Sequence, residues 1–277
     1  MSKTYSSAPL PFMGQKRRFA AEFTQALKTF DNITTVVDLF GGSGLLSHLA
    51  KRTRPDLRVV YNDFDNYSRR LANVERTNAL LNEIRDIVTD VPRDKRLPTE
   101  TKDKVLRAMK QAENSGFVDY ITLSASVLFS GKYATNFEQM QKQTMYNVVR
   151  TTGYVCDGYI DGLEVVRKDY RELFAEYAGR KDVVFLLDPP YLSTQAGSYE
   201  CYWKLADYLD VLNVLKGDVS FFYFTSNKSS ILELCEWISA NLGAQNPFAN
   251  ALRKQHETHL NYQAKYEDIM LYRKASA

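Results

Sequence analysis

Asp188-Pro189-Pro190-Tyr191 is the stretch whose residue types point most directly to a reaction. It follows five apolar residues, Val183–Leu187, which predict a buried strand that ends on the carboxylate. The lone pair of an aromatic exocyclic amine is delocalised into the ring, so the nitrogen is a poor nucleophile until acceptors draw its hydrogens. A carboxylate and a carbonyl aimed by prolines can accept both hydrogens, and a tyrosine ring can stack on a base taken out of a duplex. We interpret these residues as an amine pocket; the plain alternative is a Pro-Pro loop with an incidental tyrosine.

A glycine-rich turn, Phe40-Gly41-Gly42-Ser43-Gly44, ends a second short apolar run, Thr35–Phe40. Glycine lets the backbone turn tightly and approach a ligand without a Cβ in the way. Gly42 and Gly44 supply two of the three glycines of a dinucleotide fingerprint, and Asp63 ends the next predicted strand, where an acid can hold a ribose. The pattern favours a ligand that carries a nucleoside, although a tight strand-to-helix turn without a ligand fits it too.

The elements that must position these residues alternate between strand and helix. Apolar runs predict strands at 58–63, 163–166, 219–227 and 266–274 in addition to those above, and SSILELCEWISANL at 229–242 has the spacing of an amphipathic helix. We therefore predict an α/β fold with a doubly wound, mostly parallel sheet, in which ligands bind beyond the carboxyl ends of the strands.

Residues 90–160 interrupt this alternation. Residues 91–112 are polar and carry seven Lys or Arg against three Asp or Glu, and Ser124–Phe137 predicts a hairpin of two short strands around Ser130-Gly131-Lys132. We therefore expect a catalytic domain formed by residues 1–89 and 161–277, with 90–160 inserted between the two halves of its sheet.

Charge is spread unevenly along the chain. Residues 1–150 carry 23 Lys or Arg against 16 Asp or Glu, whereas residues 151–277 carry 13 against 17. This asymmetry fits a basic face that meets phosphates, and it fits ordinary solvated helix faces equally well.

Other features of the sequence exclude classes of protein. Three widely spaced cysteines without a CxxC pair favour neither a zinc site nor a disulfide framework, and we expect no metal. His256 and His259 lack a third ligand at a suitable spacing, which favours a solvated or phosphate-facing loop. No run of 18 apolar residues occurs, so we expect a cytoplasmic protein without membrane contact. Asp38 can cap or support the glycine turn as readily as it can touch a ligand. Core packing is expected for three larger side chains: His48, Trp203 and Trp237.

Six segments resemble, in this order, the D12 class of Dam-like DNA N6-adenine methyltransferases. They are PFMGQK (11–16), VVDLFGGSG (36–44), VVYNDFD (59–65), KDYRELF (168–174), LLDPPY (186–191) and FTSN (224–227). The pair DPPY and FGGSG is specific at this spacing, and PFMGQK narrows the match to this class. The resemblance implies a seven-stranded, Rossmann-like methyltransferase sheet with an inserted target-recognition subdomain. It implies S-adenosyl-L-methionine as cofactor and double-stranded DNA as partner, and no obligate protein partner is expected.

The resemblance also implies roles for single residues. Its cofactor contacts fall on Phe12, Gly14, Lys16, Phe40, Gly41, Gly42, Ser43, Gly44, Asp63, Asp169, Tyr170 and Asp188. Lys16 would lie near the methionyl carboxylate, and Asp63, with Asp65 as its competitor, would hold the ribose hydroxyls. Asp188 and the Pro189 carbonyl would engage the target amine, and Tyr191 would meet the flipped base.

DNA contacts are expected at Arg17, Arg18, Lys132, Tyr133 and Asn227. Lys132 could reach a phosphate or a guanine edge from the hairpin tip, although a solvated turn lysine is an equal reading. The Phe-Ser-Asn-Met-Ile-Arg pattern expected in GATC-specific members is missing, since this chain has LSASVLFSG, and the target sequence therefore stays open.

The implied mechanism is direct, in-line transfer of the methyl group to N6 of adenine, with no covalent enzyme intermediate. Two alternatives remain. The same chemistry could act on cytosine N4 in DNA or on adenine N6 in RNA, and the chain could be a non-catalytic DNA-binding relic of a methylase.

Overall fold

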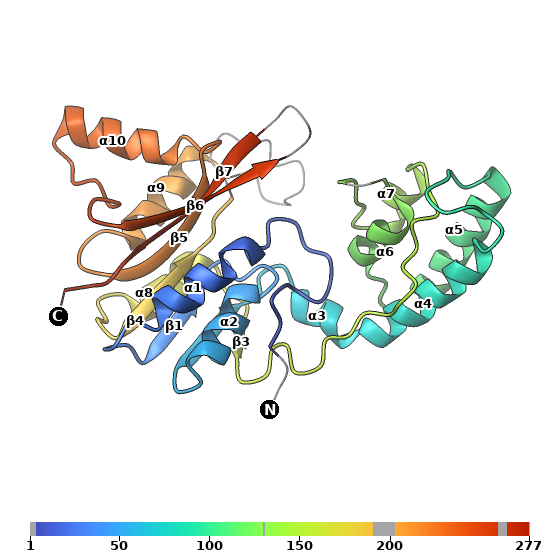
Figure 1. Cartoon of the computed structure of the whole chain (residues 1–277), viewed down its shortest axis with the longest axis horizontal. Helices are drawn as coiled ribbons and strands as arrows, with labels where there is room; N and C mark the ends of the chain where they lie inside the picture. The colour runs from blue at the N-terminus through green and yellow to red at the C-terminus, as the bar shows by residue number, and fades with distance from the viewer. Residues whose placement is uncertain (1–3, 130, 191–202, 260–264, 277) are drawn as a thin grey trace. The chain divides into compact units, whose positions relative to one another are not determined.

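The structure is a computed structural model, shown in Figure 1, and it describes residues 4–129, 131–190, 203–259 and 265–276. The chain forms two compact units. One unit consists of residues 1–15 and 66–159, and the other consists of residues 16–65 and 160–277. The second unit holds the sheet, and the first is built from helices.

The sheet has seven strands in the order β3-β2-β1-β4-β5-β7-β6. In chain order they are β1 (Thr35–Asp38), β2 (Arg58–Asn62), β3 (Glu164–Val166), β4 (Val183–Leu187), β5 (Ser220–Ser226), β6 (Leu252–His259) and β7 (Lys265–Arg273). The first five strands of the sheet are parallel, whereas β7 is antiparallel to both β5 and β6. The predicted seven-stranded, mostly parallel sheet is confirmed.

Helices cover both faces of the sheet, which makes it doubly wound. They are η1 (Arg17–Phe19), α1 (Ala20–Leu27), α2 (Leu45–Thr53), α8 (Tyr170–Tyr177), α9 (Leu205–Val214) and α10 (Ile231–Leu242). Val36 of β1 belongs to a core that includes residues of α1 and α2, whereas Val37 belongs to a core that includes residues of α8, α9 and α10. Successive strand residues face opposite sides, and both sides are buried, so the central strands are apolar at nearly every position.

Two expectations about the last part of the unit are wrong. His256 lies on the edge strand β6 rather than in a loop, with its Nε2 2.9 Å from Oε1 of Glu22 and its ring 4.9 Å from that of Phe19. The strand escaped prediction because LRKQHETH is polar, as suits an edge. Trp237 is 55% exposed on α10, whose buried residues lie on the other face of the helix. Trp203 packs against the core from a half-buried position, and His48 is fully packed as expected.

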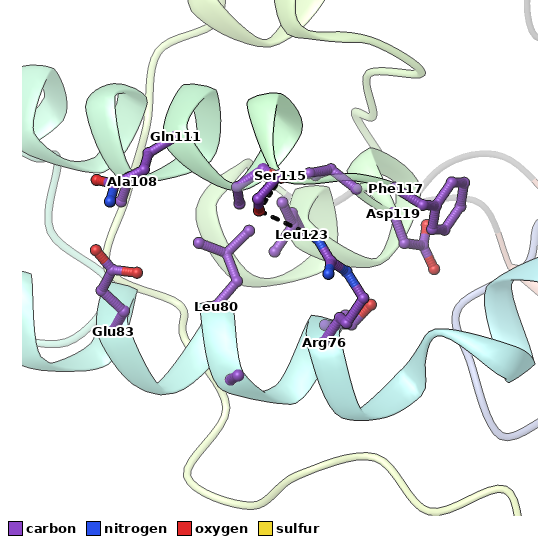
Figure 2. Close-up of a pocket in the computed structure, with 13 residues that line it drawn as sticks. Arg76, Leu80, Glu83, Ala108, Gln111, Ser115, Phe117, Asp119 and Leu123 are labelled. Atoms are coloured by element: carbon purple, nitrogen blue, oxygen red, sulfur yellow. Dashed lines mark hydrogen bonds between the residues drawn. The ribbon is translucent and has the colours of Figure 1, made fainter.

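The helical unit contains α3 (Tyr67–Ala72), α4 (Val74–Ile87), α5 (Thr99–Asn114), α6 (Tyr120–Val127) and α7 (Phe137–Gln141). Residues 66–89, which we had expected in the catalytic domain, therefore pack in this unit. A cavity of about 340 Å³ is lined by α4, α5 and the residues before and in α6, and Figure 2 shows the side chains that line it. Its lining mixes apolar groups with charges of both signs.

The predicted hairpin at Ser124–Phe137 is wrong, because Tyr120–Val127 form α6. Asp119 caps this helix by accepting a hydrogen bond from the Thr122 N–H at 3.0 Å. Tyr120, Leu123 and Val127 follow the three- and four-residue spacing of a helix and are buried. The alternation of apolar and small polar residues suggested strands, but the cap and the buried face favour a helix.

Among the residues that the structure describes, no helix is both long and apolar enough to cross a membrane. Likewise, no group of three or more His, Cys, Asp or Glu side chains in those residues is placed to hold a metal ion.

Candidate active site at the carboxyl ends of the parallel strands

Asp188 lies directly after β4 and forms an ion pair with Lys16. Lys16 Nζ is 2.6 Å from Asp188 Oδ2, and the two side chains are 8% and 22% exposed. Burial raises the pKa of Asp188 above its ordinary value, while the Lys16 ammonium acts in the opposite direction. Lys16 and Asp188, which lie far apart in the sequence, thus form a charge pair that is largely out of water.

Asp38 adds a second acid at this edge. It ends β1, is 1% exposed and accepts a hydrogen bond of 2.7 Å from Ser47 Oγ at the start of α2. Burial raises the pKa of Asp38 to about 7 against the lowering effect of Ser47, and the Asp188 carboxylate adds to the rise. An acid with this pKa is protonated in a large share of molecules at neutral pH.

The glycine turn wraps around the ring of Tyr61. The Gly44 N–H donates to the Gly41 carbonyl at 2.7 Å, and Gly44 has φ 72° as it caps α2. A Cβ on Gly41 would lie 2.3 Å from the Tyr61 ring, which leaves no room for a side chain there. Gly42 has φ 50°, and Ser43 is buried between the glycines. Packing on Tyr61 and left-handed backbone therefore require these glycines, and we call the turn Phe40–Gly44 the glycine cradle.

Gly41→Ala is expected to lower stability and to weaken binding of the cofactor that the resemblance implies, because the new Cβ meets a buried ring and the Asn62 carbonyl. Overpacking of this kind costs about 1–3 kcal/mol. We expect a lower midpoint of urea unfolding and an affinity for S-adenosylhomocysteine, an analogue of that expected cofactor, that is at least about tenfold weaker. Gly153→Ala, whose Cβ would meet only the Asn78 side chain at 3.2 Å, serves as the control. Unchanged binding by Gly41→Ala would contradict a cradle at this loop.

Asp63 follows β2 and lies next to the glycine turn. It is 2% exposed, and its Oδ1 accepts a hydrogen bond of 3.1 Å from the Tyr61 hydroxyl. The competing acid, Asp65, is exposed. Of the two, Asp63 is the one whose carboxylate is held in place beside the cradle.

Asp169 and Tyr170 begin α8 near the end of β3. Asp169 caps the helix through the Arg171 N–H at 2.8 Å, and the Arg171 guanidinium lowers the pKa of its carboxyl. The Tyr170 ring stacks on Trp203 at 5.6 Å and lies 5.0 Å from Phe40 of the glycine turn. Three aromatic rings from distant parts of the chain are thus gathered at one edge of the sheet. Trp203 was expected only as a core residue, and its place beside Tyr170 was not predicted.

The PFMGQK segment is divided between the two units. Phe12 belongs to the helical unit, where its ring meets Tyr67 edge-on at 5.8 Å, and Gly14 has φ 82°. Lys16 begins the sheet unit and pairs with Asp188. The structure therefore brings Lys16 to the site and gives Phe12 a packing partner on α3.

Pro189 is buried and Pro190 is half-buried, directly after Asp188. Tyr191, the expected contact to the flipped base, lies outside the described residues. Arg17 and Arg18 are exposed on η1, and Arg18 Nη1 donates to the Glu257 carbonyl at 2.8 Å. Each of these positions except Tyr191 has a defined place in the sheet unit.

Asn227 has a structural partner. Its side-chain Oδ1 accepts a hydrogen bond from the backbone N–H of Glu267, and its backbone N–H donates to the Glu267 carbonyl, both at 3.0 Å. This exchange extends the pairing of β5 and β7 beyond the last strand residue. The amide oxygen is therefore already used by the backbone.

The segment after α6 presents Lys132 in an exposed position, whereas Tyr133 is half-buried. Phe129 is 64% exposed beside them, with its ring 6.0 Å from Tyr146. Sequence reasoning missed Phe129, although an aromatic residue next to a Ser-Gly-Lys turn was a usable signal. An exposed ring beside a cation suits the stacking of a base.

Four of the seven cations in the basic run 91–112 have partners within the protein, and for two of them the partner is an acid. Lys104 pairs with Glu100, Lys110 pairs with Glu113, and Lys102 donates to the carbonyls of Gln141 and Gln143. Four further cations of the run are exposed: Arg93, which donates to the Val149 carbonyl, and Lys95, Arg96 and Arg107. The count of charges in the sequence overstated what this run can offer to phosphates.

The model of the D12 class N6 adenine-specific DNA methyltransferase family matches residues 12–217. A protein of Haemophilus influenzae (strain ATCC 51907 / DSM 11121 / KW20 / Rd), described as "Putative methyltransferase", is 34% identical over 280 residues, which cover 98% of this chain and 93% of that protein.

Two solved structures align over nearly the whole chain. An rRNA methylase from Streptococcus thermophilus is 9% identical with a TM-score of 0.33, over 96% of this chain and 100% of that one. A precorrin-6y C5,15-methyltransferase from Geobacter metallireducens GS-15 has the same identity and TM-score, over 98% and 100%. Likenesses this remote have no bearing on the chemistry of the site.

Proposed function

The chain belongs to the D12 class of N6 adenine-specific DNA methyltransferases, and we propose that it moves the methyl group of S-adenosyl-L-methionine to N6 of an adenine flipped out of duplex DNA. The observation that carries this proposal is the buried pair of Lys16 and Asp188 at the carboxyl end of β4, beside the glycine cradle. This pair supports the proposal because a carboxylate held at this edge of the sheet can accept a hydrogen from an exocyclic amine.

The residues around the cradle fit the proposed cofactor. Three of the five residues of the turn Phe40–Gly44 are glycines without a Cβ, so its backbone can lie close to a ligand, and the buried Asp63 carboxylate can accept hydrogen bonds from ribose hydroxyls. The rings of Phe40 and Tyr170 can pack against a purine. The Lys16 ammonium can bind the methionyl carboxylate of the cofactor. When bound, the cofactor supplies a methyl group already activated by a positive sulfur.

Residues of the chain hold and orient the target amine. Asp188 accepts one hydrogen of the target amine, and the Pro189 carbonyl, held by two prolines, accepts the other, so the nitrogen lone pair is directed at the methyl group. Lys16 keeps Asp188 in place by charge in the resting protein. Position and electrostatics account for the chemistry, and no side chain of the site needs to form a covalent bond.

Double-stranded DNA is the proposed partner. Phe129 and Lys132 supply a stacking surface and a cation on the helical unit, and Arg17 and Arg18 supply exposed cations on the sheet unit. Contacts of this kind position DNA, whereas the choice of target sequence needs base-edge contacts.

The direct test uses the purified full chain with cofactor carrying a labelled methyl group and, separately, duplex DNA or RNA. We expect label in DNA and, after digestion to nucleosides, N6-methyladenine. N4-methylcytosine, or label in RNA alone, would overturn the proposed substrate. Absence of cofactor binding by calorimetry would favour the non-catalytic alternative. Modified-base sequencing of a host that expresses the gene then reports the target sequence.

Phe129→Ala is expected to weaken DNA binding by about 10- to 100-fold, because stacking on an aromatic ring is worth about 1–3 kcal/mol per base. The KM for the cofactor should stay unchanged. Trp237→Ala is the control, since Trp237 is similarly exposed on α10 of the sheet unit. Fluorescence anisotropy with a labelled duplex measures the binding. Equal affinities for wild type and Phe129→Ala would remove Phe129 from the DNA interface.

A further inference from the structure

The last two residues of β2, Tyr61 and Asn62, are buried and point their polar atoms at the loops on either side. Asn62 is 1% exposed and Tyr61 is 0% exposed. Both residues lie in the matched segment VVYNDFD (59–65), but the resemblance assigned a role there only to Asp63 and its competitor Asp65. Buried polar side chains are retained where their hydrogen bonds have a task, because an unpaired one is costly.

The Asn62 side chain joins two segments that are far apart in the chain. Its Nδ2 donates to the carbonyls of Leu39 and Lys168, each at 3.0 Å, and its Oδ1 accepts from the Lys168 N–H at 3.0 Å. Both amide hydrogens and the oxygen are therefore used. The residue can act on a ligand only through the two segments that it joins.

Those two segments lead directly into the aromatic residues at the sheet edge. Leu39 precedes Phe40, and Lys168 precedes Asp169 and Tyr170. The Phe40 and Tyr170 rings lie 5.0 Å apart. Asn62 thus ties together the backbone at the bases of both rings, and their spacing follows from this tie.

Tyr61 makes the matching connection on the other side of β2. Its hydroxyl hydrogen is shared between the Gly42 carbonyl at 2.8 Å and Asp63 Oδ1 at 3.1 Å. Its ring fills the space under the glycine turn, where a Cβ on Gly41 would meet it. Tyr61 therefore fixes the position of the glycine turn and the orientation of the Asp63 carboxylate at the same time.

We propose that Tyr61 and Asn62 form a positioning bracket for the cofactor: Tyr61 aligns the glycine turn with Asp63, and Asn62 sets the spacing of Phe40 and Tyr170. The proposal rests on the proposed function, since it assigns these loops to S-adenosyl-L-methionine. Neither residue touches the reacting atoms, so both act on the affinity for the cofactor and not on the methyl-transfer step.

Asn62→Asp tests the tie with an isosteric change. The carboxylate loses both donors and faces two carbonyl oxygens, so the two loops should separate. We expect the KM for S-adenosyl-L-methionine to rise about 10- to 100-fold, whereas kcat at saturating cofactor should stay within about twofold of wild type. The reason is that loss of an interaction that serves only to bind the cofactor raises KM and leaves kcat unchanged. A purely destabilised protein would instead lose active molecules, which lowers kcat and leaves KM unchanged.

Asn78→Asp is the matched control. Asn78 makes the same kind of clamp in the helical unit, where its Nδ2 donates to the Tyr154 carbonyl at 2.9 Å and its Oδ1 accepts from the Tyr154 N–H at 2.7 Å. This variant should lose stability comparably without a change in the KM for the cofactor. A similar rise in that KM would show that the Asn62 effect is not local.

Tyr61→Phe tests the same proposal with a smaller change, so the test does not depend on the folding of Asn62→Asp. It removes one oxygen and keeps the ring that packs under the glycine turn. Loss of one such hydrogen bond should raise the KM for the cofactor about 3- to 10-fold. If wild type binds S-adenosylhomocysteine in calorimetry and neither variant changes the KM, the bracket is wrong and the proposed function stands. If wild type itself binds none, the proposed function fails first.

Discussion

Asp188→Ala is expected to reduce the rate of methyl transfer by about 10³-fold, the scale seen when an enzyme loses a group that stabilises its transition state. The loss should fall on kcat, because Asp188 holds the target amine at the moment when its nitrogen attacks. The measurement is single-turnover transfer of labelled methyl to duplex DNA at saturating cofactor. Retention of more than a tenth of the wild-type rate would remove Asp188 from the reaction.

Two further variants separate chemistry from folding. Asp188→Ala leaves Lys16 buried without its partner, which by itself destabilises the protein. In Asp188→Asn the amide oxygen still accepts from Lys16, so we expect nearly normal stability with a similarly large loss of kcat. Asp182→Asn changes an acid at the opposite end of the same strand, where it pairs with Arg180 on the surface. That variant should transfer methyl groups at the wild-type rate.

Asp38→Asn is expected to stabilise the protein at pH 8 and to have little effect at pH 4. Burial raises the folded-state pKa of Asp38 to about 7, whereas in the unfolded chain the group ionises near pH 4. Between these two values the folded protein holds a proton that the unfolded chain has released. Stability therefore falls as the pH rises through this window, and the full loss is reached above pH 7.

The size of the loss follows from the shift. About three pKa units correspond to at most about 4 kcal/mol. An asparagine does not titrate, so the difference in unfolding free energy between Asp38→Asn and wild type should grow across the window, as measured by urea unfolding at several pH values. Asp31→Asn, which removes an exposed acid of the same unit, is the control. A difference that is constant with pH would contradict a neutral Asp38 in the folded protein.

The order of the strands along the chain could be predicted because a strand buried on both faces must be apolar at nearly every position. Val183–Leu187 and Thr35–Asp38 show this directly, and the acids that end them had to lie at the carboxyl edge of a parallel sheet. The edge strand β6 and the helix α6 could not be predicted in the same way. Their residues are polar or mixed, and their structure depends on what they pair with or pack against.

The candidate site likewise has features that local sequence patterns predict and features that depend on long-range contacts. Local patterns suffice to predict which residue types stand at the strand ends: the acid and prolines after β4, the glycines after β1 and Asp63 after β2. Three contacts could not be predicted in this way: Lys16 lies 2.6 Å from Asp188, Asp38 is buried near Asp188, and Asn62 ties Leu39 to Lys168. These contacts join residues that are up to 172 positions apart in the chain. Local patterns do not encode them, because the burial and charge around a residue depend on the neighbours that folding brings to it.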